Sequence, residues 1–401
     1  MLYIDFYFHV HQPFRLRAFS VLDIGKNQPY FDEVKNRFVM DKVANKCYIP
    51  TNNMLLDLIK KHKGKFKVAF SITGVVIEQF KRYRPDVLDS FKALADTGCV
   101  EFVGETYYHS LAFLYDTNEF LEQVEMHKQL MQKEFGYTPE TFRNTELIYQ
   151  DRLSDLIYEL EGFKTILTEG VDRILGWRSP LFAYKNFTAE ISLLLKYYQL
   201  SDDIAFRFSN RDWPEYPLTV DKFVKWIEHF ELDPANSPHK NKFLNLFMDY
   251  ETFGEHQWAE TGIFNFMSYL PEKILKNNHL GFITPKEANK LTNYQQESLS
   301  FPEPVSWADA ERDLSAWREN DMQHNALDTF YELLDMAKSK GRTDVVETLR
   351  YLSTSDHFYY MCTKYFQDGD VHKYFSPYDS PEQAYIYFIN VLADIEEKLK
   401  A

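Results

Sequence analysis

The stretch LYIDFYFHV, at residues 2–10, decides the fold class of this chain. It is a short run of apolar and aromatic residues, and the polar side chains of His9, His11 and Gln12 stand at its end. Runs of this kind predict strands buried on both faces, as in parallel sheets covered by helices. We therefore expect a buried strand that delivers polar side chains at its carboxyl end.

The same pattern recurs further along the chain. Short runs rich in β-branched or aromatic residues, each followed by polar groups, lie at 66–73, 100–104, 141–146, 164–168, 204–208 and 243–250. Helical patterns lie between them at 52–62, 85–96, 118–135, 152–161 and 219–230. Strands that alternate with helices imply parallel pairing through crossover connections. With about seven such strands, the pattern favours an incomplete (β/α) barrel over an open doubly wound sheet.

Strand signals stop after about residue 260, and the last part of the chain is predicted to be helical. Residues 272–303 carry Asn- and Pro-bearing loops, typical of a connector or lid. Helical patterns follow at 310–318, 324–340, 343–354 and 381–400. We expect a catalytic barrel over residues 1–270 and a connector with a C-terminal helical domain over 271–401.

Composition excludes several classes of partner. The formal net charge is −15, so the surface repels phosphate backbones and anionic lipids, and neither nucleic acid nor membrane is an expected partner. Aromatic residues make up 17% of the chain, which favours carbohydrate because sugar rings stack on aromatic faces. The three cysteines, Cys47, Cys99 and Cys362, form no CxxC pair, and the N-terminus has no signal-peptide pattern. We expect a cytoplasmic protein.

No common nucleotide or hydrolase motif is present in the sequence. Walker A, GxGxxG, HExxH and GxSxG patterns are all missing. What remains is a set of carboxylates at predicted strand ends. Glycoside hydrolysis with retention needs two of them, one as nucleophile and one as general acid and base.

Glu146 closes the predicted strand at 141–146. It follows Arg143 and Asn144, and a cation or amide beside a carboxylate holds it ionised, as a nucleophile requires. The alternative is a surface glutamate that opens the next helix. From spacing alone, both interpretations stay open.

The segment MDYETFGEH, at 248–256, is more unusual. Asp249, Glu251, Glu255 and His256 follow directly on an apolar strand, a composition that is costly to bury without a purpose. Crowded carboxylates raise one another's pKa, and a general acid near neutral pH needs a raised pKa. Binding of a hard cation by the same residues is the alternative.

Histidines and tryptophans add further candidates. His9 and His11 lie on the same side of the first strand, which suits contact with sugar hydroxyls or with a metal ion. The segment at 98–109 again ends a strand with glutamate, tyrosine and His109. Trp307 and Trp317 are candidate stacking platforms, with a core position as the alternative for Trp317.

Taken together and in this order, these segments resemble the five sequence regions of glycoside hydrolase family 57, in particular its α-amylase-type members. The similar stretches are 11–13, 101–109, 142–149, 248–256 and 306–320, in the order of the regions. Phe14 departs from the first region, which often has tyrosine there. The match extends from residue 9 to about 320, and an ordered set of this kind is far more specific than one motif.

The resemblance implies an incomplete seven-stranded (β/α) barrel with a C-terminal helical domain, acting on α-1,4-glucans with retention. Glu146 would be the nucleophile and Asp249 the general acid and base. Substrate contacts are implied for His11, Glu101 and Asp313, and further for His9, His109, Glu251, Trp177 and Trp317. No cofactor and no metal are expected, because two carboxylates and water suffice. The expected partner is an α-glucan polysaccharide or oligosaccharide, and the sequence indicates no oligomeric state.

Other functions use the same residues. 4-α-Glucanotransferase or branching activity would need the same two carboxylates. A metal-dependent sugar deacetylase would use His9, His11 and Asp5 as ligands, and a non-catalytic protein would only bind glucan.

Overall fold

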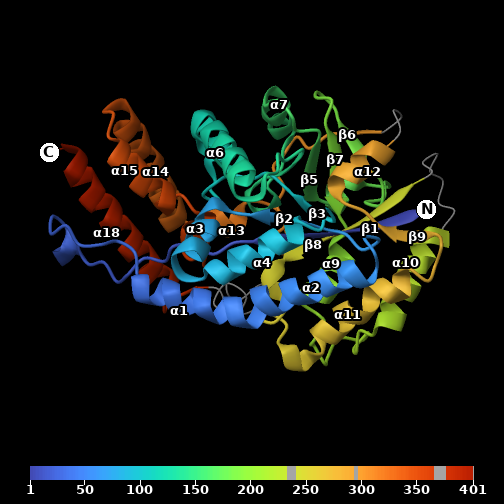
Figure 1. Ribbon diagram of the computed structural model, residues 1–401. Helices are drawn as coiled ribbons and strands as arrows, with labels where there is room; N and C mark the ends of the chain where they lie inside the picture. Colours follow the sequence, from blue (N-terminus) through green and yellow to red (C-terminus); the bar gives the residue numbers. More distant parts are fainter. Residues whose placement is uncertain (233–240, 293–296, 365–375, 401) are drawn as a thin grey trace.

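The computed structural model describes residues 1–232, 241–292, 297–364 and 376–400. Its strands are β1 (Leu2–Val10), β2 (Val68–Ile72), β3 (Val100–Phe102), β4 (Thr141–Arg143), β5 (Thr165–Glu169), β6 (Tyr184–Asn186), β7 (Ser192–Lys196), β8 (Lys242–Asp249), β9 (Leu280–Phe282) and β10 (Ser298–Leu299). They form a single mixed sheet surrounded by helices, and Figure 1 places the two termini at opposite ends of the molecule. The α/β class predicted from the sequence is confirmed.

β1 lies at the centre of the sheet, as its composition predicts. It pairs in parallel with β8 along most of its length, with β2 at its carboxyl end and with β9 at its start. The register sets His9 opposite Ser71 on one side and opposite Asp249 on the other. The polar residues at the ends of three strands are therefore neighbours.

The two faces of β1 contact different cores. Leu2, Ile4, Phe6 and Phe8 belong to the large apolar cluster under the helices. Tyr7, on the other face, packs in a smaller cluster with one side chain each from several strands: Ala69, Leu167, Leu194 and Phe247. This alternation places Tyr3, Asp5, Tyr7 and His9 on the inner face of a curved sheet.

The named strands do not close into a ring. The path runs from β6 through β7, β8, β1 and β2 to β3, while β4 and β5 join it at β7. Between β3 and β4 there is an isolated parallel bridge from Gly104 to Phe142, with backbone hydrogen bonds of 2.8 Å on either side.

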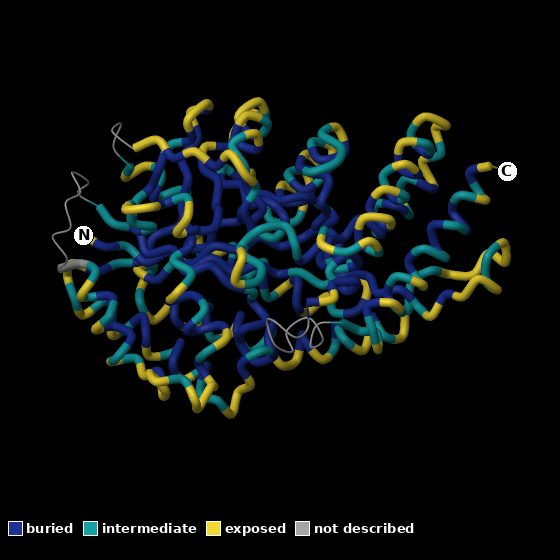
Figure 2. The backbone as a smooth tube through the Cα atoms, turned by 180° about the vertical axis from the view of Figure 1, so that it is seen from behind, coloured by how far each residue is buried: buried dark blue, intermediate teal, exposed yellow. Residues whose placement is uncertain are grey.

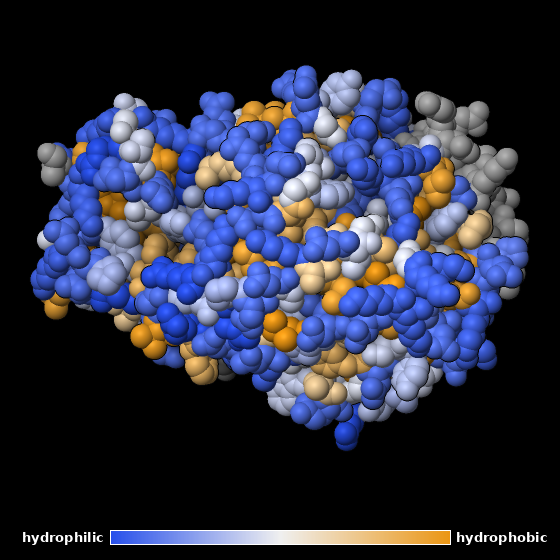
Figure 3. All heavy atoms as spheres, viewed as in Figure 1, coloured by the Kyte–Doolittle hydropathy of each residue, from blue (hydrophilic) through white to orange (hydrophobic). Residues whose placement is uncertain are grey.

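The helices cover the sheet on its outer faces. They are α1 (Glu33–Val43), α2 (Ile49–Lys61), α3 (Gly74–Tyr83), α4 (Pro85–Ala95), α5 (Ala112–Tyr115), α6 (Thr117–Phe135), α7 (Asp151–Glu159), α8 (Asp172–Leu175), α9 (Tyr198–Ala205), α10 (Val220–Leu232), α11 (Ile263–Ile274), α12 (Pro285–Leu291), α13 (Ser315–Arg318), α14 (Asp321–Ser339), α15 (Thr343–Leu352), α16 (Ser355–Tyr359) and α18 (Pro381–Lys400). Figure 2 shows the strands buried in the middle and the exposed positions on the outer turns. Hydrophilic side chains cover most of the face drawn in Figure 3. None of the described helices is both long enough and apolar enough to cross a bilayer.

Local signals set the helix ends. α6 begins after Asp116, whose carboxylate accepts hydrogen bonds from the backbone N–H groups of Asn118 and Glu119. It ends at Gly136, which has φ 63° in the left-handed region that favours glycine.

The C-terminal helices share their core with part of the sheet. The second apolar cluster contains Phe142 of β4 and Leu193 of β7 together with Phe330 of α14 and Phe388 of α18. In Figure 1, α14, α15 and α18 stand side by side at one end of the molecule. The division at residue 270 therefore does not separate two hydrophobic cores.

The structure corrects three predicted elements. Residues 204–208, predicted as a strand, belong to the end of α9 and the turn after it, and the actual strand is β7. Strands do occur after residue 260, namely β9 and β10 inside the predicted connector, of which residues 293–296 lie outside the described part. The helix predicted at 310–318 is reduced to α13, because Asp309 and Arg312 have φ 54° and 50° and break the helix.

Candidate active site

A cavity of about 590 Å³ opens at the carboxyl ends of the parallel strands. Its lining includes His9 from β1, Glu146 from the loop after β4, Lys196 from β7 and Asp249 from β8. Later segments complete the wall with Trp307 and, from α16, Asp356. Reactive groups in barrel-like α/β folds gather at this end of the strands.

Glu146 has an unusual backbone. It lies in the short 3₁₀ turn Thr145–Leu147 with φ 58°, and Leu147 follows with φ 52°. A non-glycine residue in this region costs about 1–3 kcal/mol and persists only where its surroundings hold it. His109, which contacts the Glu146 side chain, has φ 52° as well.

Three donors surround the Glu146 carboxylate. Ser355 Oγ and His109 Nε2 lie 2.9 Å and 3.1 Å from Oε1, and the Trp307 indole donates to Oε2 at 2.8 Å. Hydrogen bonds to a charged group contribute about 1.5–3 kcal/mol each, so together they outweigh the backbone strain. The side chain keeps 18% of its surface exposed, toward the cavity, so a substrate can reach it.

These contacts keep Glu146 ionised. Burial raises the pKa of the Glu146 carboxyl. The hydrogen bond from His109 and the charges of His109 and Arg143 lower this pKa by more, so the resulting pKa lies below the ordinary value of glutamate. Burial lowers the pKa of His109, yet its hydrogen bonds to Glu105 and Glu146 raise it to about 9. His109 is therefore an imidazolium that donates to both carboxylates.

The pKa of the Asp249 carboxyl is shifted in the opposite direction, upward. Asp249 is the last residue of β8, and burial followed by the negative charge of Glu146 raises its pKa to about 6. Glu251, two residues on, has a pKa raised to about 8 by burial and by the charge of Asp249. Tyr48 Oη donates to Glu251, and Gln12 Nε2 does so at 3.3 Å. Of these three carboxyls, Glu146 is therefore ionised near pH 5, while Asp249 and Glu251 are mainly protonated.

A tight glycine turn fixes the loop after β8. Gly254 has φ 102°, and a Cβ at this position would lie 1.9 Å from the carbonyl oxygen of Lys46. Only glycine fits both requirements. The turn therefore packs the loop after β8 against the segment Ala44–Tyr48, from which Tyr48 donates to Glu251.

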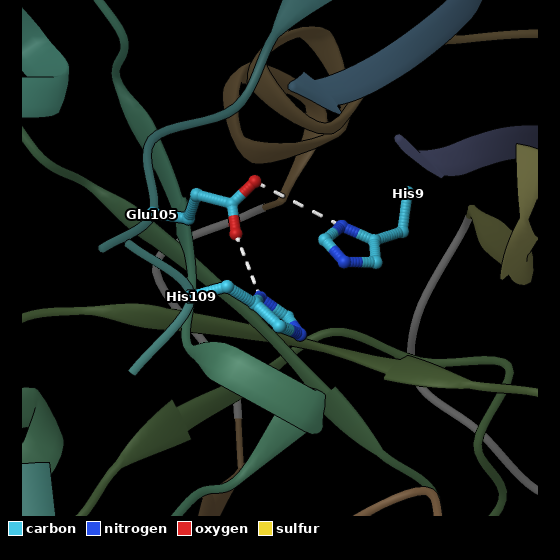
Figure 4. Close-up of side chains that lie close together, drawn as sticks. All are labelled: His9, Glu105 and His109. Atoms are coloured by element: carbon cyan, nitrogen blue, oxygen red, sulfur yellow. Dashed lines mark hydrogen bonds and ion pairs between the residues drawn. The ribbon is translucent and has the colours of Figure 1, made fainter. Parts of the chain in front are cut away.

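His9, Glu105 and His109 form a cluster beneath the cavity (Figure 4). His9 Nδ1 lies 3.8 Å from Glu105 Oε1, and His109 Nδ1 lies 3.3 Å from Glu105 Oε2. The His11 ring lies 4.3 Å from the His109 ring between centroids and is tilted against it, and His11 Nε2 forms a 3.0 Å hydrogen bond with Asp356 Oδ2. Both groups have ligand types and spacing that could hold a metal ion. In the first group, the imidazolium of His109 and the guanidinium of Arg143 already offset the negative charge of Glu105.

The structure brings together seven of the ten predicted site residues at the cavity. Its wall includes His9, His11, His109, Glu146, Asp249, Glu251 and Trp317. Trp317 is only 1% exposed and packs in the second apolar cluster, so its role as a core residue dominates.

Three predicted contact residues lie elsewhere. Glu101 is 2% exposed under the sheet, where it accepts hydrogen bonds from Thr141 Oγ1 at 2.6 Å and from the backbone N–H of Lys286 at 2.8 Å. The Asp313 side chain accepts from Ser315 and is not among the lining residues. Trp177 is 81% exposed on the outer surface. The structure therefore places these three residues outside the cavity lining, and substrate contact at these positions stays a prediction.

The ligand set of the deacetylase alternative is not assembled either. Asp5 precedes His9 by four residues on β1, which separates them by about 13 Å along an extended strand. Asp5 is fully buried, and burial followed by the charges of Glu101 and Glu287 raises its pKa well above the ordinary value.

Sequence reasoning missed several residues of the site. Glu105 lies four residues after Glu101, the glutamate that was chosen, and four residues before His109, a spacing that the sequence shows. Ser355 and Asp356 open α16, where a polar Thr-Ser-Asp-His run interrupts the helical pattern. Lys196 follows a leucine run whose strand was not recognised.

Comparison with known proteins agrees with this geometry. The sequence profile of glycosyl hydrolase family 57 matches residues 5–302. A protein of Methanocaldococcus jannaschii with the provisional name alpha-amylase is 43% identical over 99% of this chain and 85% of its own length. Alpha-amylase 1 of Dictyoglomus thermophilum is 23% identical over 77% of this chain and 44% of its own.

Solved structures share the fold. A family 57 branching enzyme from Pyrococcus horikoshii has a TM-score of 0.70 at 15% identity, over 96% of this chain and 88% of that one. A 4-alpha-glucanotransferase from Thermococcus litoralis has a TM-score of 0.59 at 19% identity, over 90% of this chain and 51% of that one. The fold, the paired carboxylates and the sequence matches define a glycoside hydrolase. The chain belongs to glycosyl hydrolase family 57.

Proposed function

We propose that this chain cleaves α-1,4-linked glucans with retention, through a covalent glycosyl-enzyme on Glu146 and with Asp249 as general acid and base. One observation carries the proposal: the two carboxyls line one cavity, and their surroundings move their pKa values in opposite directions. A nucleophile must be ionised while the acid is protonated. The alpha-amylase names of the relatives support the α-glucan substrate.

In the first step the ionised Glu146 attacks the anomeric carbon, and the glycosidic bond breaks. Asp249 gives its proton to the departing oxygen, which leaves as a hydroxyl of the shortened chain. In the second step the Asp249 carboxylate takes a proton from water, and the resulting hydroxide oxygen bonds to the anomeric carbon. Glu146 leaves as a carboxylate, so two inversions give net retention.

The polar groups around the two carboxyls suit a sugar. We assign contacts with substrate hydroxyls to His9, His11, His109 and Glu251, which line the cavity and offer both donors and acceptors. Phe206, which is 54% exposed at the cavity wall, offers an apolar face for a sugar ring.

We assign the sheet to an incomplete seven-stranded barrel. The seven members are β1, β2, β3, β4, β5, β7 and β8, with the Gly104–Phe142 bridge supporting contact between β3 and β4. Residues 1–270 would supply this barrel, and residues 271–401 a connector and the C-terminal helical part. The later part also lines the cavity, through Trp307 and Asp356.

The pH dependence of kcat/KM is expected to be bell-shaped with a falling limb near pH 6. Asp249, with a pKa of about 6, must be protonated to act as an acid, so activity falls as pH rises through that value. Glu146 must be ionised, and its lowered pKa places the acid limb below the ordinary range of glutamate. Initial rates on maltoheptaose between pH 3.5 and 8.5 measure both limbs, and activity that still rises above pH 7.5 would contradict the assignment.

Chelation is expected to leave the activity unchanged. The proposed chemistry uses two carboxylates and water, so dialysis against EDTA followed by assay in metal-free buffer should retain the full rate. Loss of activity that Zn²⁺ or Mn²⁺ restores would instead support metal chemistry at the His9–Glu105–His109 cluster.

Product analysis separates the candidate reactions. Maltoheptaose and glycogen are incubated with the protein, and products are identified by mass spectrometry and by NMR of the linkages. Shorter sugars alone support hydrolysis, whereas longer sugars show transfer to a second glucan, and new α-1,6 linkages show branching. No change in either substrate, under conditions where the protein is folded, would overturn the α-glucan assignment.

A further inference from the structure

Trp307 contacts Glu146 at two points. Its indole Nε1 donates to the Glu146 carboxylate at 2.8 Å, and its backbone N–H donates to the Glu146 carbonyl at 3.1 Å. One residue thus holds both the side chain and the left-handed backbone of Glu146. No motif in the sequence indicates this contact, because the two residues are 161 positions apart.

Neighbouring backbone contacts fix Trp307 in this position. Val305 and Tyr149 exchange two hydrogen bonds, of 2.9 and 3.0 Å, which align the two segments in an antiparallel bridge. Ser306 Oγ donates to the carbonyl of Asp313 at 2.5 Å and accepts from the N–H of Ala308. The segment 305–308 is therefore anchored on both sides of the indole.

Two cations lie over the indole ring. The guanidinium carbon of Arg143 lies 4.6 Å and the Lys196 ammonium 5.6 Å from the ring centroid. Arg143 is fully buried, and its three guanidinium nitrogen atoms have no hydrogen-bond partner among the described residues, so the cation–π contact with this ring helps to stabilise the buried charge. The ring surface that would stack on a sugar is thus partly occupied. This argues against Trp307 as a stacking platform.

We propose that Trp307 is a positioning residue for the nucleophile: it clamps Glu146 through both hydrogen bonds and holds Arg143 against its ring, where the guanidinium charge acts on the carboxylate. The inference rests on the proposed role of Glu146, and it adds a residue that acts through Glu146. Arg143 and the indole N–H donor stabilise the ionised carboxylate, and the backbone hydrogen bond retains the strained turn that aims it at the cavity.

The indole proton of Trp307 reports on the clamp without any substrate. The chain has six tryptophans, so ¹⁵N-indole labelling gives six resolvable N–H signals at most. The signal absent from Trp307→Phe identifies Trp307. We expect this signal to shift with pH in the wild type, following Glu146, and to stop shifting in Glu146→Gln. A Trp307 signal that is independent of pH and of Glu146→Gln would overturn the proposal.

Trp307→Phe tests the consequence for the carboxylate. The variant keeps an aromatic ring but loses the Nε1 donor, so the Glu146 pKa, followed by carboxyl ¹³C NMR, should rise by about one unit. The pKa of the acid limb in the pH profile of kcat/KM should increase by the same amount. We expect a lower kcat and a nearly unchanged KM. Trp317→Phe is the control, because the buried Trp317 indole N–H has no hydrogen-bond partner among the described residues, and the Glu146 pKa should stay in place.

The outcomes separate this inference from the proposed function. A raised Glu146 pKa in Trp307→Phe, in a protein that acts on no glucan, supports the clamp and refutes the α-glucan assignment. An unchanged Glu146 pKa in a folded Trp307→Phe variant refutes the clamp, whatever the activity. Near-wild-type circular dichroism establishes that the variant is folded.

Discussion

Glu146→Gln is expected to lower kcat on maltoheptaose by about four orders of magnitude or more. The amide has nearly the shape of the carboxylate, but it cannot form the covalent bond to the anomeric carbon. Ser355, His109 and Trp307 can still donate to the remaining carbonyl oxygen or pack against the amide, so the fold and substrate binding should persist. Steady-state rates and glucan binding by isothermal titration calorimetry measure the two effects separately.

Glu101→Gln is the matched control for this variant. Glu101 is also a buried glutamate, but it does not line the cavity. A glutamine oxygen can still accept from the Lys286 N–H, while the amide nitrogen can donate to Thr141 Oγ1. Its kcat should stay within about threefold of the wild type. Comparable rates for Glu146→Gln and wild type would exclude a nucleophilic role and would favour a protein that only binds glucan.

Asp249→Asn is expected to lower kcat on maltoheptaose about 100- to 10,000-fold, the usual contribution of a general acid and base. The loss should depend on the leaving group. A maltosyl fluoride needs no proton to depart, so its first step should remain fast, and the glycosyl-enzyme should accumulate. Added azide, which attacks the anomeric carbon without base assistance, should then restore turnover and yield a glycosyl azide of retained configuration.

The falling limb near pH 6 should also disappear in Asp249→Asn, because the group that titrates there is removed. Asp313→Asn serves as the control, since Asp313 lies in a loop outside the cavity lining. A limb near pH 6 that persists in Asp249→Asn would assign it to another group, and equal losses for the fluoride and for maltoheptaose would argue against acid catalysis by Asp249.

Strands were predicted most accurately from the sequence where the composition of the strand itself differs from that of a helix. β1 was predicted at its observed bounds, because its residues are apolar on one face and aromatic or polar on the other, and few helices have that composition. β7 was missed because its leucine-rich run is buried on both faces, and such a run does not differ in periodicity from a buried helix. The C-terminal helices were located well, but their shared core with the sheet depends on contacts far apart in the chain.

The site residues that could be predicted from the sequence are likewise those that follow predicted strands. Asp249 ends β8 and Glu146 follows β4 by three residues, so the shared carboxyl edge of the sheet brings both near the cavity. Ser355 and Asp356 come from a helix start that only tertiary packing carries to the cavity, and no pattern in the sequence singled them out. The left-handed turn at Glu146 is likewise invisible in the sequence, because nothing local requires it.

The most direct test of the account is to trap the glycosyl-enzyme. The protein is treated with 5-fluoro-α-glucosyl fluoride, digested, and the labelled peptide is identified by tandem mass spectrometry, with maltoheptaose protection as a control for site occupancy. We expect a single label, on Glu146, and no label in the Glu146→Gln variant. A label on a different carboxylate, or products whose anomeric configuration is inverted by NMR, would contradict the account.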